Sequence, residues 1–222
     1  MPVRAPDRVS PQPLARAPEP ATISREKSGT AFFVDDAGHM LTARHAAEDC
    51  ARIVVAKEGR AVAARIVALS PSVDLALIKV PKTMGLAAVF PRSATVSAND
   101  MVFAAAYDTL PPLVGRGGTL ANATVVSSHD GGAEAGYLAI DSSVTFGASG
   151  APVLDGRGLV EGVISRRTMV NRVLAVGAGE AKAFLASNGV RPAEDDRPQI
   201  AGGTSRANRA ASISARVTCL QN

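Results

Sequence analysis

The chain has 222 residues, of which 46% are hydrophobic and 20% charged, so it can bury the core of one domain or two small lobes and is not a disordered, collagenous or coiled-coil chain. The formal net charge of +4 comes from Lys and Arg residues scattered along the sequence, and only 4% of residues are aromatic, which argues against a nucleic-acid partner. No apolar run approaches the roughly 18 residues of a membrane span, so we expect none.

Residues 1–23 are rich in proline and lack hydrophobic periodicity, which predicts an extended N-terminal arm. From residue 24 to about 90 the sequence consists of short apolar runs separated by turn residues. Two of them, 31–34 and 40–42, flank the segment Asp35-Asp36-Ala37-Gly38, a pattern typical of a β-hairpin. We therefore expect a first β-lobe over about 24–90.

A second set of strand-like runs covers about 98–177, with turns such as Pro111-Pro112 between them. The segment 179–187 is rich in alanine and is followed by Asn188-Gly189, the residues that a helix C-terminus prefers. The sequence thus predicts a second β-lobe, then one short helix.

The C-terminal residues 191–222 read as a polar linker and a final strand, beyond a domain that spans 24–190. Alternate residues are apolar at its end, namely Ile213, Ala215, Val217 and Cys219. A period of two predicts a strand with one buried face, so we expect Cys219 to face inward.

A serine on a glycine-bracketed turn is the first candidate for chemistry. Ser149 lies in the segment Gly147-Ala148-Ser149-Gly150-Ala151-Pro152, between two strand-like runs. Such a turn can expose the hydroxyl while aiming backbone N–H groups. Serine is a weak nucleophile alone, so it needs a base within hydrogen-bond reach and a carboxylate that orients the base.

Three histidines are candidates for that base. His39 and His129 lie in polar turns, whereas His45 follows an apolar run at a strand end. For the carboxylate, Asp74 directly precedes the apolar run Leu75-Ala76-Leu77-Ile78, where it can be partly buried and would need a partner.

Three segments in this order resemble the signatures of chymotrypsin-fold serine proteases: Leu41-Thr42-Ala43-Arg44-His45, Asp74-Leu75-Ala76-Leu77-Ile78 and the serine turn. The opening Ser28-Gly29-Thr30-Ala31-Phe32-Phe33-Val34 resembles the bacterial HtrA-type branch more than the digestive enzymes. The resemblance covers about 28–187. Only about 30 residues follow the predicted helix, so we expect no PDZ domain after it.

The resemblance implies an all-β fold of two six-stranded antiparallel β-barrels with a short C-terminal helix. It implies a serine endopeptidase that cuts polypeptides through an acyl-enzyme on Ser149, with His45 as general base and then acid, and Asp74 fixing the tautomer of His45. The backbone N–H groups of Gly147 and Ser149 would form the oxyanion hole. No metal or organic cofactor is implied.

The resemblance also indicates residues of the substrate pocket, which are Ser143, Val144, Ile164, Ser165 and Arg166. Ser143 stands where trypsin-type enzymes carry a specificity carboxylate, so we expect a modest apolar pocket rather than one for Arg or Lys. Ser165 is expected to bond the catalytic aspartate. The pair Arg166-Arg167 is expected at a solvated rim that favours acidic substrate residues.

Two alternatives stay open. Cys50 and Cys219 have no metal-ligand spacing and form either two free thiols or one disulfide; a disulfide favours a periplasmic or secreted protein. Ala148 and Ala151 stand where relatives often carry other residues. They leave room for a catalytically silent fold that binds peptides or acts as a scaffold.

Overall fold

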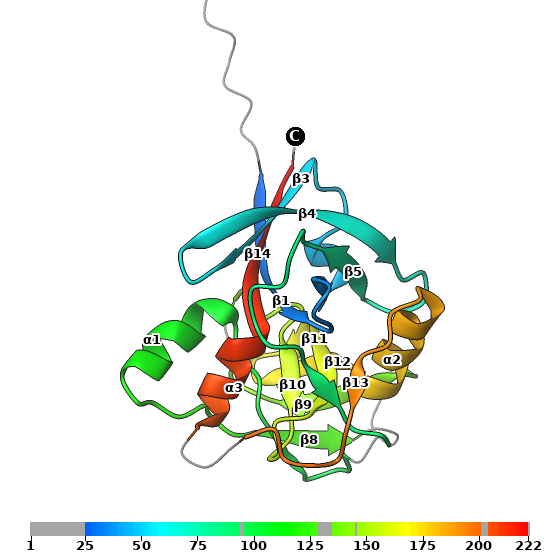
Figure 1. Cartoon of the computed structure of the whole chain (residues 1–222). Coiled ribbons are helices and arrows are strands. Elements are labelled where there is room, and N and C mark those ends of the chain that lie inside the picture. Colours follow the sequence, from blue (N-terminus) through cyan, green and yellow to red (C-terminus); the bar gives the residue numbers. More distant parts are fainter. Residues whose placement is uncertain (1–24, 94–95, 128–134, 145, 201–203, 222) are drawn as a thin grey trace, which may run out of the picture.

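The computed structural model describes residues 25–93, 96–127, 135–144, 146–200 and 204–221. The N-terminal arm expected at 1–23 and the turn around His129 lie outside these residues. The expected all-β fold is confirmed: fourteen strands, two of them in a small separate pair, and a few short helices make up the described part of the chain (Figure 1).

The first barrel is closed and has the strand order β1-β14-β3-β4-β5-β2. Its strands are β1 (Glu26–Phe33), β2 (His39–Thr42), β3 (Arg52–Lys57), β4 (Arg60–Leu69), β5 (Ala76–Lys79) and β14 (Ser214–Leu220). The hairpin expected around Asp35–Gly38 is present, since Ala31 pairs with Thr42.

The second barrel is a six-stranded sheet in the order β10-β11-β12-β9-β8-β7. A bridge between Phe103 and Leu154 joins its two edges, so it is nearly closed. Its strands are β7 (Met101–Val102), β8 (Ala123–Ser127), β9 (Tyr137–Asp141), β10 (Pro152–Leu154), β11 (Val160–Met169) and β12 (Arg172–Gly177). The small pair of β6 (Val89–Phe90) and β13 (Ala193–Glu194) is parallel.

The predicted helix is present as α2 (Ala178–Ser187), with Asn188 at its C-terminus and Gly189 at a φ of 74°. Two further helices were not expected. At α1 (Leu110–Gly115) the sequence suggested a turn, but Pro111 and Pro112 lie in the first turn of the helix, where no backbone donor is required. Two 3-10 turns, η1 (Arg44–Ala46) and η2 (Tyr107–Thr109), complete the helical segments.

The C-terminal segment departs most from its expected form. It contains α3 (Arg206–Ile213), where Ser205 caps the N-terminus by accepting a hydrogen bond from the Asn208 backbone N–H at 3.1 Å. Strand β14 then runs between β1 and β3, as Figure 1 shows (red beside blue). The first barrel therefore needs residues beyond 190, and Cys219 is fully buried in it.

Neighbouring residues of β1 join two different cores, because successive side chains of a strand point to opposite faces. Phe33 packs inside the first barrel, while Phe32 lies in a second apolar cluster with Leu154 and Val176 from the other barrel. That second cluster holds the barrels together. The catalytic candidates lie on elements from both sides of it.

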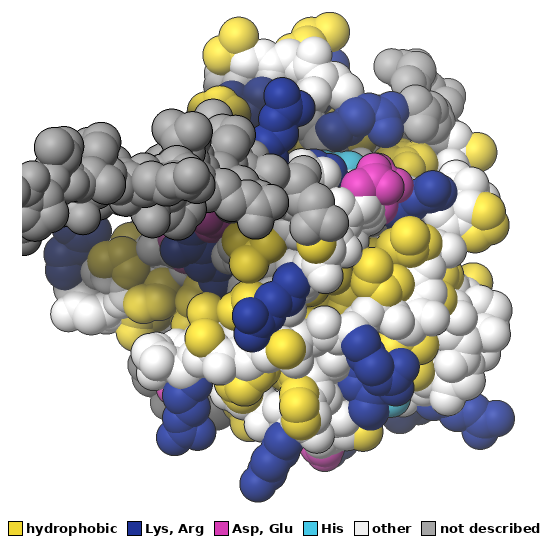
Figure 2. All heavy atoms as spheres, turned by 90° about the horizontal axis from the view of Figure 1, so that it is seen from above, with side chains coloured by type: hydrophobic (Ala, Val, Ile, Leu, Met, Phe, Trp, Pro, Cys, Tyr) yellow, Lys and Arg dark blue, Asp and Glu magenta, His cyan; other side chains and the backbone are white. Residues whose placement is uncertain are grey.

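Figure 2 shows one face of the molecule, where the charged side chains lie in separate groups with apolar and neutral side chains between them. This face thus carries no continuous basic stripe. No helix of the described ranges has the length and apolarity that a membrane crossing requires.

Candidate active site

The turn that carries Ser149 fits tightly against the first barrel. Gly150 has a φ of 83°, and a methyl group there would overlap the Thr30 carbonyl oxygen and the Thr42 hydroxyl. Only glycine combines this left-handed backbone with so close an approach. The Thr30 N–H also donates to the Ser149 carbonyl oxygen at 2.8 Å, which joins the serine turn to β1.

The three residues predicted for catalysis lie together. His45, in η1, has its Nδ1 2.8 Å from Asp74 Oδ2 and its Nε2 2.9 Å from Ser149 Oγ. The His45 backbone N–H donates to the other oxygen of Asp74 at 3.1 Å. His45 and Asp74 come from the first barrel and Ser149 from the second, so the packing of the two barrels creates the constellation.

The carboxylate of Asp74 is held in its charged form. Burial raises its pKa, but hydrogen bonds from the His45 ring, the Ser165 hydroxyl and the His45 backbone outweigh burial and lower the pKa to about 2. The hydrogen bond and the charge of Asp74 in turn raise the pKa of His45, against the effect of burial. At neutral pH the charged Asp74 can therefore stabilise the His45 imidazole when it takes up a proton from a neighbouring group.

Two residues of the second barrel position Asp74. Ser165 is fully buried, and its hydroxyl donates to Asp74 Oδ2 at 2.5 Å, the contact that the sequence indicated. The Tyr137 hydroxyl accepts a hydrogen bond from the Asp74 backbone N–H at 3.0 Å, which sequence reasoning missed. Nothing in the sequence near Tyr137 signals this contact, because it joins β9 to the segment before β5, far apart in the chain.

The expected oxyanion-hole donors lie in the serine turn. The backbone N–H groups of Gly147 and Ser149 have no acceptor within the described ranges. The Gly147 carbonyl oxygen accepts the Thr30 hydroxyl at 2.8 Å, and Thr30 in turn accepts the Tyr107 N–H at 2.9 Å. Thr30, fully buried in β1, thus holds both ends of the turn, and sequence reasoning also missed this role.

A pocket of about 180 Å³ opens beside Ser149. Of the predicted pocket residues, it is lined by Val144, Ile164 and Ser165. Ser143 is exposed and lines a neighbouring hollow with Ser142 and Ala105 instead.

Arg166 is also not among the residues that line this pocket. Its guanidinium lies over the Tyr137 ring, 5.7 Å from the ring centroid. A register shift in β11 between Ile164 and Arg166 changes which side chains point inward, and Arg167 lines the pocket in its place.

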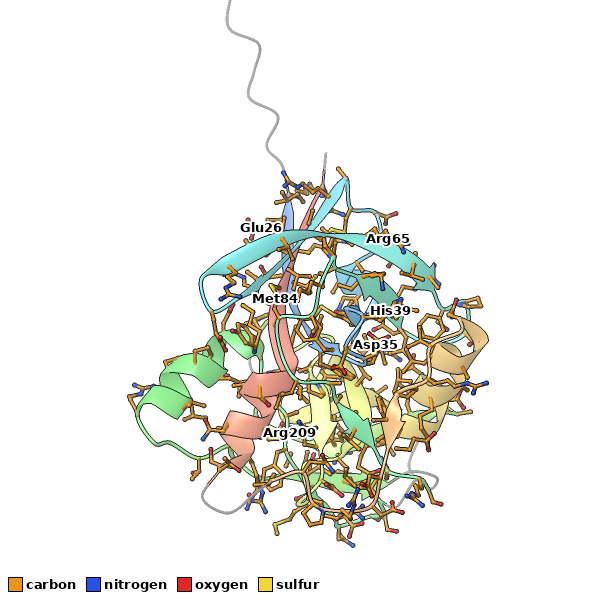
Figure 3. The ribbon with its side chains drawn as sticks, in the orientation of Figure 1. Glu26, Asp35, His39, Arg65, Met84 and Arg209 are labelled. Atoms are coloured by element: carbon orange, nitrogen blue, oxygen red, sulfur yellow. A yellow bond between two sulfur atoms is a disulfide. The ribbon has the colours of Figure 1, made fainter. Side chains whose placement is uncertain are left out.

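The remaining histidine and cysteine candidates are also placed. His39 pairs with Asp35, Nδ1 to Oδ2 2.6 Å, and their side chains lie next to each other in Figure 3. This pair has no serine hydroxyl beside it among the contacts of the described residues. Cys50 and Cys219 form a disulfide that ties the segment after η1 to β14. The described ranges hold no group of three or more metal-ligating side chains.

The sequence is similar to a known domain family and to several bacterial proteins. Residues 29–163, more than half of the chain, match the trypsin-like peptidase domain. The chain is 31% identical over 217 residues to the uncharacterized protein y4bJ of Sinorhizobium fredii, covering 91% of this chain and 34% of that protein. It is 29% identical over 156 residues to a probable periplasmic serine endoprotease, DegP-like, of Brucella suis, covering 67% of this chain and 29% of the relative. The chain thus spans about a third of the length of these relatives.

Solved structures share the fold. A serine endoprotease from Yersinia pestis matches with a TM-score of 0.60 and 21% identity, over 72% of this chain and 57% of that one. The Rv3671c protease of M. tuberculosis, in an inactive form, matches with a TM-score of 0.57 and 24% identity, over 74% of this chain and 88% of that one.

Proposed function

Because the chain belongs to the trypsin-like peptidase domain family, we propose that it is a serine endopeptidase that hydrolyses polypeptides through an acyl-enzyme on Ser149. The observation that carries the proposal is the continuous hydrogen-bonded series from Asp74 through His45 to Ser149, with links of 2.8 and 2.9 Å. A partly buried carboxylate, an imidazole and a serine hydroxyl in this order are the groups that acyl transfer requires.

In the first half of the reaction, Ser149 Oγ attacks the carbonyl carbon of the substrate while His45 Nε2 takes the hydroxyl proton. The negative oxygen that develops accepts hydrogen bonds from the Gly147 and Ser149 N–H groups, whose lack of other acceptors leaves them available. Asp74 stabilises the imidazolium without taking its proton. The C–N bond then breaks, and His45 gives the proton to the leaving amine.

In the second half, water replaces the amine. His45 takes a proton from the water as it attacks the acyl carbon, and the proton returns to Ser149 Oγ when the ester bond breaks. Ser149, His45 and Asp74 each return to their starting protonation state, so the cycle is complete with these three side chains and water.

We also propose a periplasmic or secreted location. The Cys50–Cys219 disulfide supports it, since such bonds persist in oxidising compartments. The Brucella suis relative is itself named as a probable periplasmic enzyme.

Labelling with a fluorophosphonate tests the catalytic proposal, because only an activated serine reacts quickly with this reagent. We expect one adduct by intact mass on the wild type, and none on Ser149→Ala or His45→Ala. His39→Ala is the matched control: this histidine also pairs with an aspartate but takes no part in the proposed reaction, so the adduct should persist. No adduct on the folded, oxidised wild type would contradict the proposal and favour a silent peptide-binding fold.

A further inference from the structure

Apart from Ser149 and Ser165, the pocket beside Ser149 has apolar walls at every lining residue but one. Val144, Ile164 and Val173 contribute aliphatic side chains, and each is at most 8% exposed. Arg167 is the one ionisable side chain among the described residues that line the pocket. A substrate side chain that enters the pocket meets these aliphatic walls and a single positive charge.

The guanidinium of Arg167 is held by neutral groups only. One of its terminal nitrogens donates to the Val144 carbonyl oxygen and the other to the Val170 carbonyl oxygen, the latter at 3.1 Å. No described carboxylate forms an ion pair with it. Arg172 on the same hairpin differs, because its Nε lies 3.2 Å from the Asp141 carboxylate.

An arginine held in this way has unused N–H donors. A guanidinium carries five N–H donors in a planar fork that matches a carboxylate. Two donors contact backbone carbonyls, so three remain for a ligand in the pocket. Arg167 is exposed, so a ligand carboxylate can reach these donors from solvent.

We propose that Arg167 makes the enzyme select peptides with Glu or Asp immediately before the cleaved bond. This inference rests on the proposed peptidase function and names the substrate class of that site. The guanidinium pairs with the side-chain carboxylate, while the aliphatic walls contact its methylene groups. Lys or Arg at the same substrate position would meet the like charge of Arg167 and is disfavoured.

The test compares peptides that differ only at the residue before the cleaved bond, which is Glu, Gln or Lys. We expect kcat/KM for Glu to exceed that for Gln by about tenfold or more, the effect of one charge-assisted hydrogen bond. Arg167→Gln should remove the preference, and Arg167→Glu should make the Lys peptide the better substrate. Arg172→Gln is the matched control, because it removes a cation from the same hairpin outside the pocket, and should keep the preference.

Two results would overturn the inference while the peptidase function stands: equal rates for Glu and Gln in the wild type, or a Glu preference that Arg167→Gln retains. The fluorophosphonate adduct separates these from a failure of the function itself, since it does not depend on the substrate side chain. Absence of both adduct and peptide cleavage would reject both proposals together.

Discussion

The Cys50–Cys219 disulfide should contribute a large part of the stability of the fold. The two residues are 169 positions apart, so the bond closes most of the chain into one loop, with β1 and β2 outside it. The chain-entropy relation gives about 17 cal/mol/K for a loop of this length, or about 5 kcal/mol at 25 °C. Cys50→Ala is the suitable change, because Cys50 is half-buried, whereas replacing the fully buried Cys219 would also leave a cavity.

Urea unfolding measures the effect. With an m-value of about 2 to 3 kcal/mol/M, a loss of about 5 kcal/mol moves the midpoint of Cys50→Ala down by about 2 M. Dithiothreitol should lower the midpoint of the wild type to that of the variant and leave the variant unchanged. A difference below about 0.5 M between oxidised wild type and variant would refute the loop-closure argument.

Four further changes test the site and its support. Since neutral His45 is the proposed base and Asp74 raises its pKa, kcat/KM should rise with pH through a midpoint above 6.5, and a midpoint at or below that value would contradict the pairing. Ser165→Ala removes a hydrogen bond to the Asp74 carboxylate and should lower kcat about tenfold with KM unchanged in steady-state assays; an unaltered kcat would exclude its role. Thr30→Val removes the hydroxyl that holds the Gly147 carbonyl oxygen and should slow fluorophosphonate labelling about tenfold, whereas Thr30→Ser should keep the wild-type rate. Equal labelling rates for all three proteins would contradict this role of Thr30. The Lys57 side chain is only 3% exposed and donates to the carbonyl oxygens of Ala211 and Ser214. Lys57→Met should therefore lower the free energy of unfolding by about 2 kcal/mol in urea titrations, whereas Arg60→Met, at an exposed position of the same hairpin, should change it little.

Much of the fold could be predicted because its signals are local. The apolar runs of the first lobe and the turn at Asp35–Gly38 carry the hairpin pattern, and they became β1 and β2. The segment 179–187 ends in residues typical of a helix C-terminus, and α2 ends there. The grouping of His45, Asp74 and Ser149 came from a resemblance in three ordered segments, since no local pattern brings residues so far apart together.

What could not be predicted depends on contacts between distant segments. Helix α3 has a serine cap and several good helix formers, but eight residues are too few for a helix that is stable alone. Burial of Ala207, Ala210 and Ile213 against the barrels stabilises it. Thr30 and Tyr137 look like ordinary strand residues, and their hydroxyl contacts arise only after the barrels pack. The exchange of Arg166 for Arg167 in the pocket follows from one register shift in β11, which sequence alternation cannot reveal.

The C-terminal strand explains why the site depends on residues far from its chemistry. Strand β14 closes the barrel that carries His45 and Asp74, and its Cys219 bonds the segment directly after η1. The turn that carries Ser149 is attached to the same barrel by Thr30 in β1, the strand next to β14. The Thr30 N–H donates to the Ser149 carbonyl oxygen, and its hydroxyl donates to the Gly147 carbonyl oxygen. Any loss of β14 would leave β1 and β3 with unpaired edges and loosen both connections at once. Unfolding of the first barrel should therefore also break the 2.9 Å contact between Ser149 Oγ and His45 Nε2, in the same step.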